Sequence, residues 1–381
     1  MKATKRMAVD LTVRALVFLI VAIPVVGREN TNFDETLLQE RWNKNVQAMF
    51  VFGDSVLDAG TNNYFASLLK ANMKPYGEAY FGKPTGRFTN GRTYADFFAE
   101  RLGLNSPEPY LKRERTWHIL KGVNYASGGS GVLETTNEEK KVISFPHQIL
   151  QFNQTRISIT QTLGSDKAAQ LLFSQSLFLI SIGGNDLIRY LSPTSPPFDI
   201  FLKNLTTEIE KSVGQLYEAG GRKFMFLSLG PVGCIPAVLV NVGSTDGTCY
   251  EPANALAKAY NTLLEQMVLQ RFPKIFPDIK AIVGKPYETL AGLVANGKES
   301  GFTGGLNACC GYGLYNAQVQ CGLPPSLITN PPYNVCEDVH TYLFWDHFHP
   351  TERVYAIVAK MFWNGGLDIV APMNLKTLAK L

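Results

Sequence analysis

Short apolar runs recur along the chain and predict the strands of a central sheet. Four such runs lie at residues 48–52, 176–182, 223–229 and 279–283, and the first of them ends at Gly53. Short, continuously apolar runs are typical of strands that are buried on both faces. The runs therefore indicate a sheet in the interior of the molecule.

Segments between these runs have the spacing of amphipathic helices. Apolar residues recur at helical intervals in residues 93–101, 201–218 and 253–271. Strands that alternate with helices indicate an α/β fold, in which a mostly parallel sheet carries helices on both faces. In such sheets the active site lies at the C-terminal ends of the strands.

The first 27 residues have the pattern of a secretory signal peptide. Basic residues precede an apolar run of 12 residues at positions 15–26. This run is too short for a membrane helix, which needs about 20 residues, but it suits a signal peptide. Cleavage before Arg28 would leave residues 28–381 as a single secreted domain. An uncleaved anchor is the alternative, and no later segment is long and apolar enough for stable membrane insertion.

Secretion changes the interpretation of the six cysteines, which all lie in the second half of the chain. Their number is even and no Cys-x-x-Cys pair occurs, so disulfides in an oxidising compartment are favoured over a zinc site. Six cysteines allow 15 pairings. We expect every pair to lie within residues 234–336, because the cysteines are Cys234, Cys249, Cys309, Cys310, Cys321 and Cys336.

Two Asn-x-Thr triplets gain meaning if the chain is secreted. They begin at Asn153 and Asn204, and each is a candidate N-glycosylation site.

The charge balance argues against a nucleic-acid partner. The 36 Lys and Arg residues and 32 Asp and Glu residues leave a formal net charge of only +4, whereas nucleic-acid binding needs clustered basic residues. With 45% hydrophobic and 18% charged residues, the composition is that of a globular protein.

A serine follows directly on the first predicted strand, in Gly53-Asp54-Ser55. A serine at a strand end can point its hydroxyl into a cleft, but it is a poor nucleophile until a base takes its proton. The alternative is a turn in which Asp54 and Ser55 cap the next helix. Ser55 is thus a candidate nucleophile that needs a partner elsewhere in the chain.

A candidate base and a carboxylate to orient it lie together near the C-terminus. Asp346 precedes His349 by three residues, and Pro350 is expected at the first position of a helix. A carboxylate beside an imidazole fixes its tautomer and stabilises the imidazolium. The alternatives are a histidine that caps the helix, and a metal site formed by Asp346, His347 and His349.

Two further segments offer hydrogen-bond donors. Residues 124–131 form a glycine-rich loop, and Asn185 follows the apolar run at residues 176–182. Acyl transfer needs such donors at the developing oxyanion. A phosphate-binding loop is the alternative, but neither segment has the pattern Gly-x-x-x-x-Gly-Lys-Ser/Thr or Gly-x-Gly-x-x-Gly.

In this order along one chain, these segments resemble the plant branch of the GDSL esterase/lipases, within the SGNH hydrolase superfamily. That superfamily is named for a serine, a glycine, an asparagine and a histidine in four separate blocks, which match Ser55, Gly129, Asn185 and His349. Asp346 completes an Asp-x-x-His element. The similarity runs from about residue 50 to about residue 352 and includes segments at residues 86–92, 234–236 and 308–311.

The resemblance implies a flavodoxin-like three-layer α/β/α fold with a mostly parallel central sheet. It implies a catalytic triad of Ser55, His349 and Asp346, and an oxyanion hole made by the N–H of Ser55, the N–H of Gly129 and the side chain of Asn185. No metal and no organic cofactor are needed. The substrate would be a small-molecule or lipid ester, hydrolysed through an acyl-enzyme in the cell wall or apoplast.

Two other functions remain open for a chain with these residues. An extracellular acyltransferase would pass the acyl group to a sugar, a polyol or a hydroxy-acyl acceptor, and its acyl-enzyme would be the same. A non-catalytic wall or partner-binding protein would keep the fold alone.

Overall fold

Within the residues that the structure describes, six strands form the central sheet, in the order β2-β1-β3-β4-β5-β8. The structure is a computed structural model that describes residues 46–112, 118–192, 195–322 and 333–381, so the predicted signal peptide lies outside the described residues. The first five strands in this order are parallel, and β8 runs antiparallel to β5. The strands are β1 (Met49–Gly53), β2 (Gly122–Asn124), β3 (Leu177–Ser181), β4 (Lys223–Leu227), β5 (Lys280–Gly284) and β8 (Val370–Ala371).

The four apolar runs of the sequence are β1, β3, β4 and β5, each within two residues of its predicted bounds. The two strands of the central sheet that the pattern did not reveal are its shortest, at three residues for β2 and two for β8. Their short length leaves too few positions for a periodic signal. They occupy the two edges of the sheet.

Alternate side chains of β1 enter two separate cores, because successive residues of a strand point to opposite faces. Phe50 and Phe52 belong to the core on one face, and Met49 and Val51 to the core on the other. All four are buried completely. The continuous apolar run is therefore what a strand between two helical layers requires.

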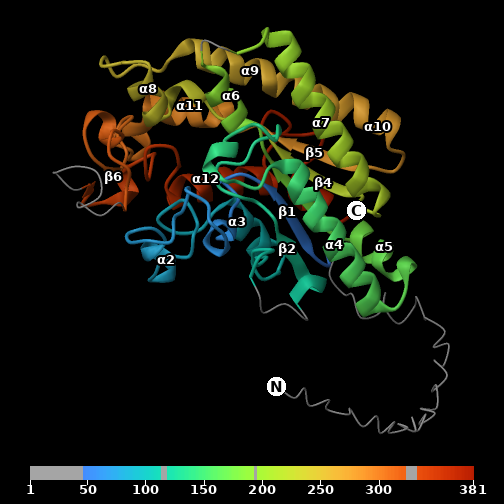
Figure 1. The fold of residues 1–381 in the computed structure, drawn as a ribbon. Helices are drawn as coiled ribbons and strands as arrows, with labels where there is room; N and C mark the ends of the chain where they lie inside the picture. The colour runs from blue at the N-terminus through green and yellow to red at the C-terminus, as the bar shows by residue number, and fades with distance from the viewer. Residues whose placement is uncertain (1–45, 113–117, 193–194, 323–332) are drawn as a thin grey trace, which may run out of the picture.

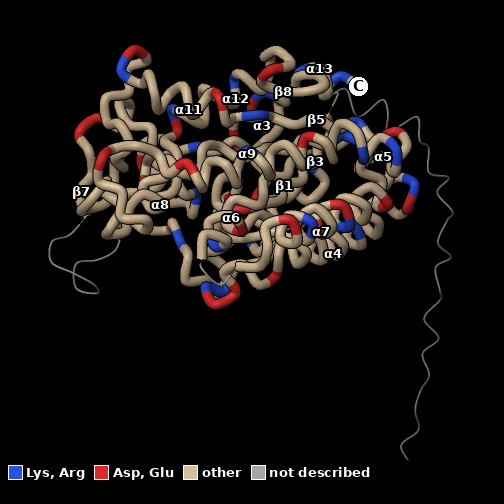
Figure 2. The backbone as a smooth tube through the Cα atoms, turned by 90° about the horizontal axis from the view of Figure 1, so that it is seen from above, with Lys and Arg blue, Asp and Glu red and all other residues tan. Residues whose placement is uncertain are grey.

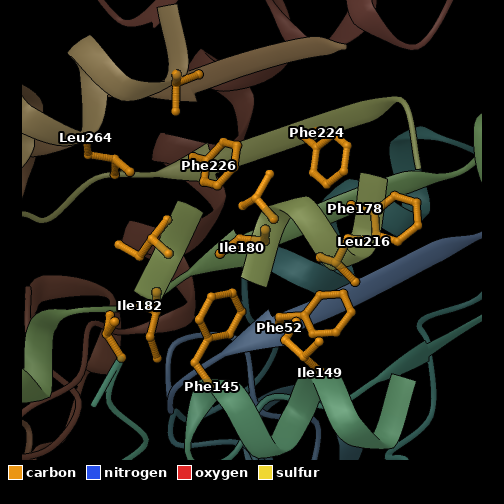
Figure 3. Close-up of a cluster of buried hydrophobic side chains, with 14 of the residues drawn as sticks. Phe52, Phe145, Ile149, Phe178, Ile180, Ile182, Leu216, Phe224, Phe226 and Leu264 are labelled. Atoms are coloured by element: carbon orange, nitrogen blue, oxygen red, sulfur yellow. The ribbon is translucent and has the colours of Figure 1, made fainter. Parts of the chain in front are cut away.

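One face of the sheet is covered by α4 (Phe145–Leu163), α5 (Asp166–Ser174), α7 (Phe198–Glu218) and α9 (Glu251–Gln266). Figure 3 shows Phe145 and Ile149 of α4 directed toward Phe52 and Phe178 of the strands. The rings of Phe52 and Phe178 stack with centroids 6.4 Å apart. Burial of such large rings is the main stabilising contribution in this layer.

The other face is covered by α3 (Tyr94–Arg101), α12 (Glu352–Asn364) and α13 (Leu375–Leu378). Thr93 and Asp96 form a capping box at the start of α3, which satisfies N–H groups of its first turn. The two sets of helices and the sheet between them make the three-layer α/β/α fold, as predicted (Figure 1).

The predicted helices correspond to α3, α7 and α9. The third begins two residues early, at Glu251, and its last predicted turn, Met267–Arg271, has π-helical hydrogen bonding. The remaining α-helices and strands in the described ranges are α2 (Glu78–Phe81), α6 (Gly184–Tyr190), α8 (Pro236–Asn241), α10 (Phe272–Ile275), α11 (Tyr287–Asn296), β6 (Cys310–Gly311) and β7 (Asn334–Val335).

All six cysteines are paired, and every pair lies within residues 234–336, as expected from the sequence. The disulfides join Cys234 to Cys249, Cys309 to Cys336, and Cys310 to Cys321. Two of them surround the small β6–β7 pair, which has only two residues in each strand. Covalent links are a common way to hold a region that is too small for a hydrophobic core of its own.

None of the helices in the described ranges is long and apolar enough to cross a membrane. Basic and acidic positions are interspersed around the molecule, and neither sign covers a whole side in the view of Figure 2.

Candidate active site

Ser55 lies just beyond the C-terminal end of β1. Gly53, the last residue of that strand, has φ +147°, and a Cβ there would lie 2.1 Å from the carbonyl oxygen of Ser181 on β3. Only glycine fits this close approach of two backbones. The Asp54 N–H then donates to the same Ser181 oxygen at 3.2 Å. The turn presents Ser55, which is 9% exposed.

The loop before α12 holds Asp346 and His349. Its shape depends on an isolated bridge between Phe344 and Pro350, and on a hydrogen bond from the Trp345 N–H to the His349 carbonyl at 2.7 Å. The loop therefore folds back on itself and turns both functional side chains inward.

The expected helix start at Pro350 is wrong, because Thr351 is the N-cap and α12 begins at Glu352. Pro350 is held in extended structure by its bridge to Phe344, and its carbonyl accepts a hydrogen bond from the Thr89 hydroxyl at 3.0 Å. The Glu352 N–H donates to the side chain of Asn90 at 2.8 Å, so a distant residue caps the helix.

Ser55, His349 and Asp346 form a continuous hydrogen-bonded chain. The Nε2 atom of His349 lies 2.7 Å from Ser55 Oγ, and its Nδ1 atom lies 2.7 Å from Oδ1 and 2.9 Å from Oδ2 of Asp346. A carboxylate can only accept, so Nδ1 carries the proton and Nε2 is free to accept from the Ser55 hydroxyl. This is the tautomer that a general base requires.

The surroundings of Asp346 keep it ionised. Its Oδ1 atom accepts from the backbone N–H groups of Phe348 at 2.9 Å and His349 at 2.8 Å, and its Oδ2 atom accepts from the Tyr76 hydroxyl at 2.7 Å. Burial by itself would raise the pKa of Asp346. The charge and hydrogen bond of His349, with the smaller effects of His347 and Tyr76, outweigh burial and hold that pKa well below its usual range.

Gly129 and Asn185 line the same cavity as Ser55 and His349. Gly129 has φ +84°, a conformation that other residues rarely adopt, and a Cβ there would lie 2.3 Å from Cδ1 of Leu69, which would have to shift. Of the three glycines in this loop, Gly129 is the one in the cavity lining, and the neighbouring Gly128 N–H donates to Asp58 at 2.8 Å. One N–H of the Asn185 amide donates to the Ser130 carbonyl at 2.9 Å, and the amide has a second N–H to offer.

The cavity has a volume of about 450 Å³, within the usual range of small-molecule sites. Most of the side chains that complete its lining are apolar, among them Leu229, Val232, Ile235, Leu290, Val294 and Leu343. Lys140 and Arg189 are the basic residues in the described lining. The arrangement places a hydroxyl, a base and N–H donors beside an apolar space.

Comparison with known proteins decides the family. The family model described as GDSL-like lipase/acylhydrolase matches residues 49–362. The chain belongs to this family. GDSL esterase/lipase 6 of Arabidopsis thaliana is 36% identical over 344 residues, which cover 88% of this chain and 91% of that protein. GDSL esterase/lipase 5 of the same plant is 32% identical and covers 100% of this chain and 98% of its own length.

Membership makes this GDSL chain a carboxylic ester hydrolase, as the resemblance implied. The structure brings the five predicted catalytic and oxyanion-hole residues to the lining of one cavity, although Ser55 and His349 are 294 positions apart. The proposed capping role for His349 does not fit, because Thr351 is the N-cap of α12.

The alternative considered from the sequence was a metal site formed by Asp346, His347 and His349. His347 lies next to the hydrogen-bonded chain of the GDSL site. Burial lowers the pKa of His347 and favours its neutral form, against the opposing charge of Asp346. Across the described ranges, no three His, Cys, Asp or Glu side chains are grouped so that they could hold a metal ion.

Three buried residues of the GDSL site were not identified from the sequence: Tyr76, Asp58 and Gln148. Tyr76 contacts Asp346, and Asp58 accepts from the N–H groups of Gly60, Thr61 and Gly128 at 2.6–2.8 Å. Gln148 contacts the backbone before Ser55. Asp58 had a visible signal, since it lies three residues after Ser55 in a segment rich in turn residues. Gln148 had another, since it interrupts the apolar face of a helix.

The two sequons lie on the helices that cover one face of the GDSL fold. Asn153 is half-buried on α4, and Thr155 of its triplet is buried. Asn204 is exposed on α7.

Proposed function

We propose that this GDSL hydrolase is a secreted esterase that cleaves acyl esters with Ser55 as nucleophile, His349 as general base and Asp346 as the orienting carboxylate. The observation that carries the proposal is the pair of short contacts on the two sides of the His349 ring, 2.7 Å to Ser55 Oγ and 2.7 Å to Asp346 Oδ1. A serine activated by an oriented imidazole is the arrangement that acyl transfer needs.

In the first step His349 Nε2 takes the hydroxyl proton as Ser55 Oγ bonds to the ester carbonyl carbon. The carbonyl electron pair moves to oxygen, and the N–H groups of Ser55, Gly129 and the Asn185 amide stabilise that charge. When the carbon–oxygen bond to the alcohol breaks, His349 gives its proton to the leaving oxygen. Water then attacks the acyl-enzyme by the same route, so that the acid and free Ser55 result.

The apolar lining supports an apolar acyl group as the part of the substrate that enters the cavity. Leu290 and Val294 are one turn apart on α11 and half-buried, and they line the cavity with Leu229 and Leu343. Each methylene that leaves water contributes about 0.8 kcal/mol, or roughly fourfold in affinity. Short- to medium-chain nitrophenyl esters should therefore show kcat/KM rising with acyl length, and a maximum at acetate would contradict this assignment.

The acyltransferase alternative differs only in the second step, where an alcohol replaces water. Product analysis with a long-chain ester, with and without an added polyol or sugar, separates the two. Free acid in both reactions supports hydrolysis, whereas a new ester as the main product supports transfer.

The three disulfides support folding in an oxidising compartment such as the secretory pathway. We expect the mature chain to be residues 28–381 in the cell wall or apoplast, with glycan on Asn153 and Asn204. Enzymatic removal of N-glycans from the secreted protein should lower its mass, and Asn204→Gln should remove one glycan.

The direct test of the mechanism is Ser55→Ala. This variant should lose turnover of a nitrophenyl ester and covalent labelling by a fluorophosphonate, while its unfolding curve stays close to that of the wild type. Undiminished labelling would eliminate Ser55 as the nucleophile.

A further inference from the structure

Gln148 is a completely buried amide on the apolar face of α4. Its neighbours on this face are Phe145, Ile149 and Phe152, and Figure 3 shows Phe145 and Ile149 of this face directed toward Phe52 of the sheet. Burial of an amide is unfavourable unless its N–H and C=O groups find partners. The partners of Gln148 therefore explain why a polar residue is tolerated at this position.

The first partner is the backbone of Gly53. Oε1 of Gln148 accepts from the Gly53 N–H at 2.8 Å, and Nε2 donates to the Gly53 carbonyl at 2.8 Å. This double contact also defines which end of the amide is oxygen, since a donor and an acceptor face it. Gly53 is the last residue of β1 and lies two positions before Ser55, so α4 holds the strand end from which Ser55 projects.

The second partner is the loop that carries Gly129. Nε2 of Gln148 lies 3.0 Å from Ser130 Oγ and 2.9 Å from the Ile143 carbonyl, and the Ser130 hydroxyl donates to the same carbonyl at 2.9 Å. The Ser130 carbonyl accepts from the Asn185 amide at 2.9 Å. Ser130 thus connects Gln148 to two of the proposed oxyanion donors. It is the next residue after Gly129 in the chain, and its carbonyl accepts the hydrogen bond from Asn185.

We infer that Gln148 is a positioning residue that sets the distance between Ser55 and the oxyanion donors on the neighbouring loops. One side-chain amide joins the strand end before the nucleophile to the loop that carries Gly129. These two segments are far apart along the chain, at residues 53 and 130, so the hydrogen bonds of Gln148 connect them directly. The inference rests on the proposed function, because the distance matters only if Ser55 attacks an ester. A misplacement of about 1 Å can lower a rate about 100-fold.

The test is Gln148→Met, which keeps the length of the side chain and removes its hydrogen bonds. We expect kcat to fall at least tenfold with KM within about twofold, and fluorophosphonate labelling to slow by the same factor. Ile159→Ala is the matched control, because Ile159 is buried on the same face of α4, about three turns away. It should lower the melting temperature but leave kcat near that of the wild type when both are measured well below melting.

Ser130→Ala is the second variant. It removes the hydroxyl that contacts both Gln148 Nε2 and the Ile143 carbonyl, and it leaves the two contacts of Gln148 with Gly53 in place. It should lower kcat severalfold without a change in KM, and it carries the test if Gln148→Met fails to fold. If Gln148→Met folds and has the kcat of the wild type, the inference is overturned. If only Ser130→Ala folds, a wild-type kcat in that variant overturns it. A wild-type protein without ester turnover or labelling would instead overturn the proposed function, so the two failures are distinguishable.

Discussion

The hydroxyl of Tyr76 donates a hydrogen bond to Oδ2 of Asp346 at 2.7 Å. The other oxygen, Oδ1, accepts from two backbone N–H groups of its own loop. Both carboxylate oxygens therefore have donors besides the ring of His349. The Tyr76 hydroxyl is buried and stays protonated, because burial and the neighbouring Asp346 raise its pKa well above the ordinary value. It is a permanent donor to the carboxylate that orients the base.

Tyr76→Phe should lower kcat/KM by about tenfold to a hundredfold, the effect of losing one hydrogen bond to a charged group. The ring remains, so its contact with Trp345 should persist. Steady-state kinetics on one soluble ester provides the measurement. Tyr355→Phe is the control, because the buried Tyr355 hydroxyl has no hydrogen-bond partner among the described residues. Equal effects of the two substitutions would mean that the Tyr76 hydroxyl has no special role.

His349→Ala should reduce kcat as much as the loss of Ser55, because the members of a triad act as a unit. Asp346→Asn should lower kcat somewhat less, on the order of 10³- to 10⁴-fold, since it disturbs the tautomer of His349 and leaves the base in place.

His347→Ala should change kcat by less than tenfold, and a chelator should have no effect. An essential His347 beside a dispensable His349, or inhibition by the chelator, would revive the metal alternative.

Asn185→Ala should lower kcat about 100- to 1,000-fold with little change in KM, as expected for a donor that acts mainly on the transition state. The measurement is a full kcat and KM determination on a nitrophenyl ester. Tyr190→Phe is a suitable control on the same helix, because its hydroxyl donates to the Pro196 carbonyl at 2.9 Å and does not line the cavity among the described residues. A rise in KM with unchanged kcat would assign Asn185 to substrate binding.

A pH-dependent stability is expected from Asp54. Burial raises the pKa of this carboxyl from 3.8 to about 7, although the Val56 N–H and the charge of His349 oppose the change. Between these two pH values the folded state holds a proton that the unfolded chain has lost. The contribution of Asp54 to the free energy of unfolding is therefore full below about pH 3.8 and is lost as pH rises to about 7.

Asp54→Asn removes this titration. Relative to the wild type, its free energy of unfolding should rise between pH 4 and pH 7.5 by on the order of 3 kcal/mol. Denaturant unfolding at several pH values measures the difference. Glu218→Gln, which removes an exposed carboxylate at the end of α7, should show no comparable trend. A constant difference between Asp54→Asn and the wild type would mean that Asp54 is ionised throughout.

Much of the fold was accessible from local pattern. The apolar runs that became β1, β3, β4 and β5 are readable because a strand buried on both faces has no polar position to interrupt it. Ser55, Asp346 and His349 were identified because each belongs to a short motif with recognisable neighbours. The disulfide region was also visible from the clustering of cysteines, but the choice among 15 pairings needed the folded loops.

What the sequence determined by itself was the class of fold and the residues of the hydrogen-bonded chain, because these depend on periodicity and on residues close together. Only the tertiary structure decided that Tyr76 meets Asp346 across 270 positions and that Gln148 meets Gly53 across 95. It also decided that α12 starts at Glu352, where Asn90 supplies the cap. Such pairings depend on how helices pack on the sheet, and no local pattern encodes which distant backbone group a buried side chain will reach.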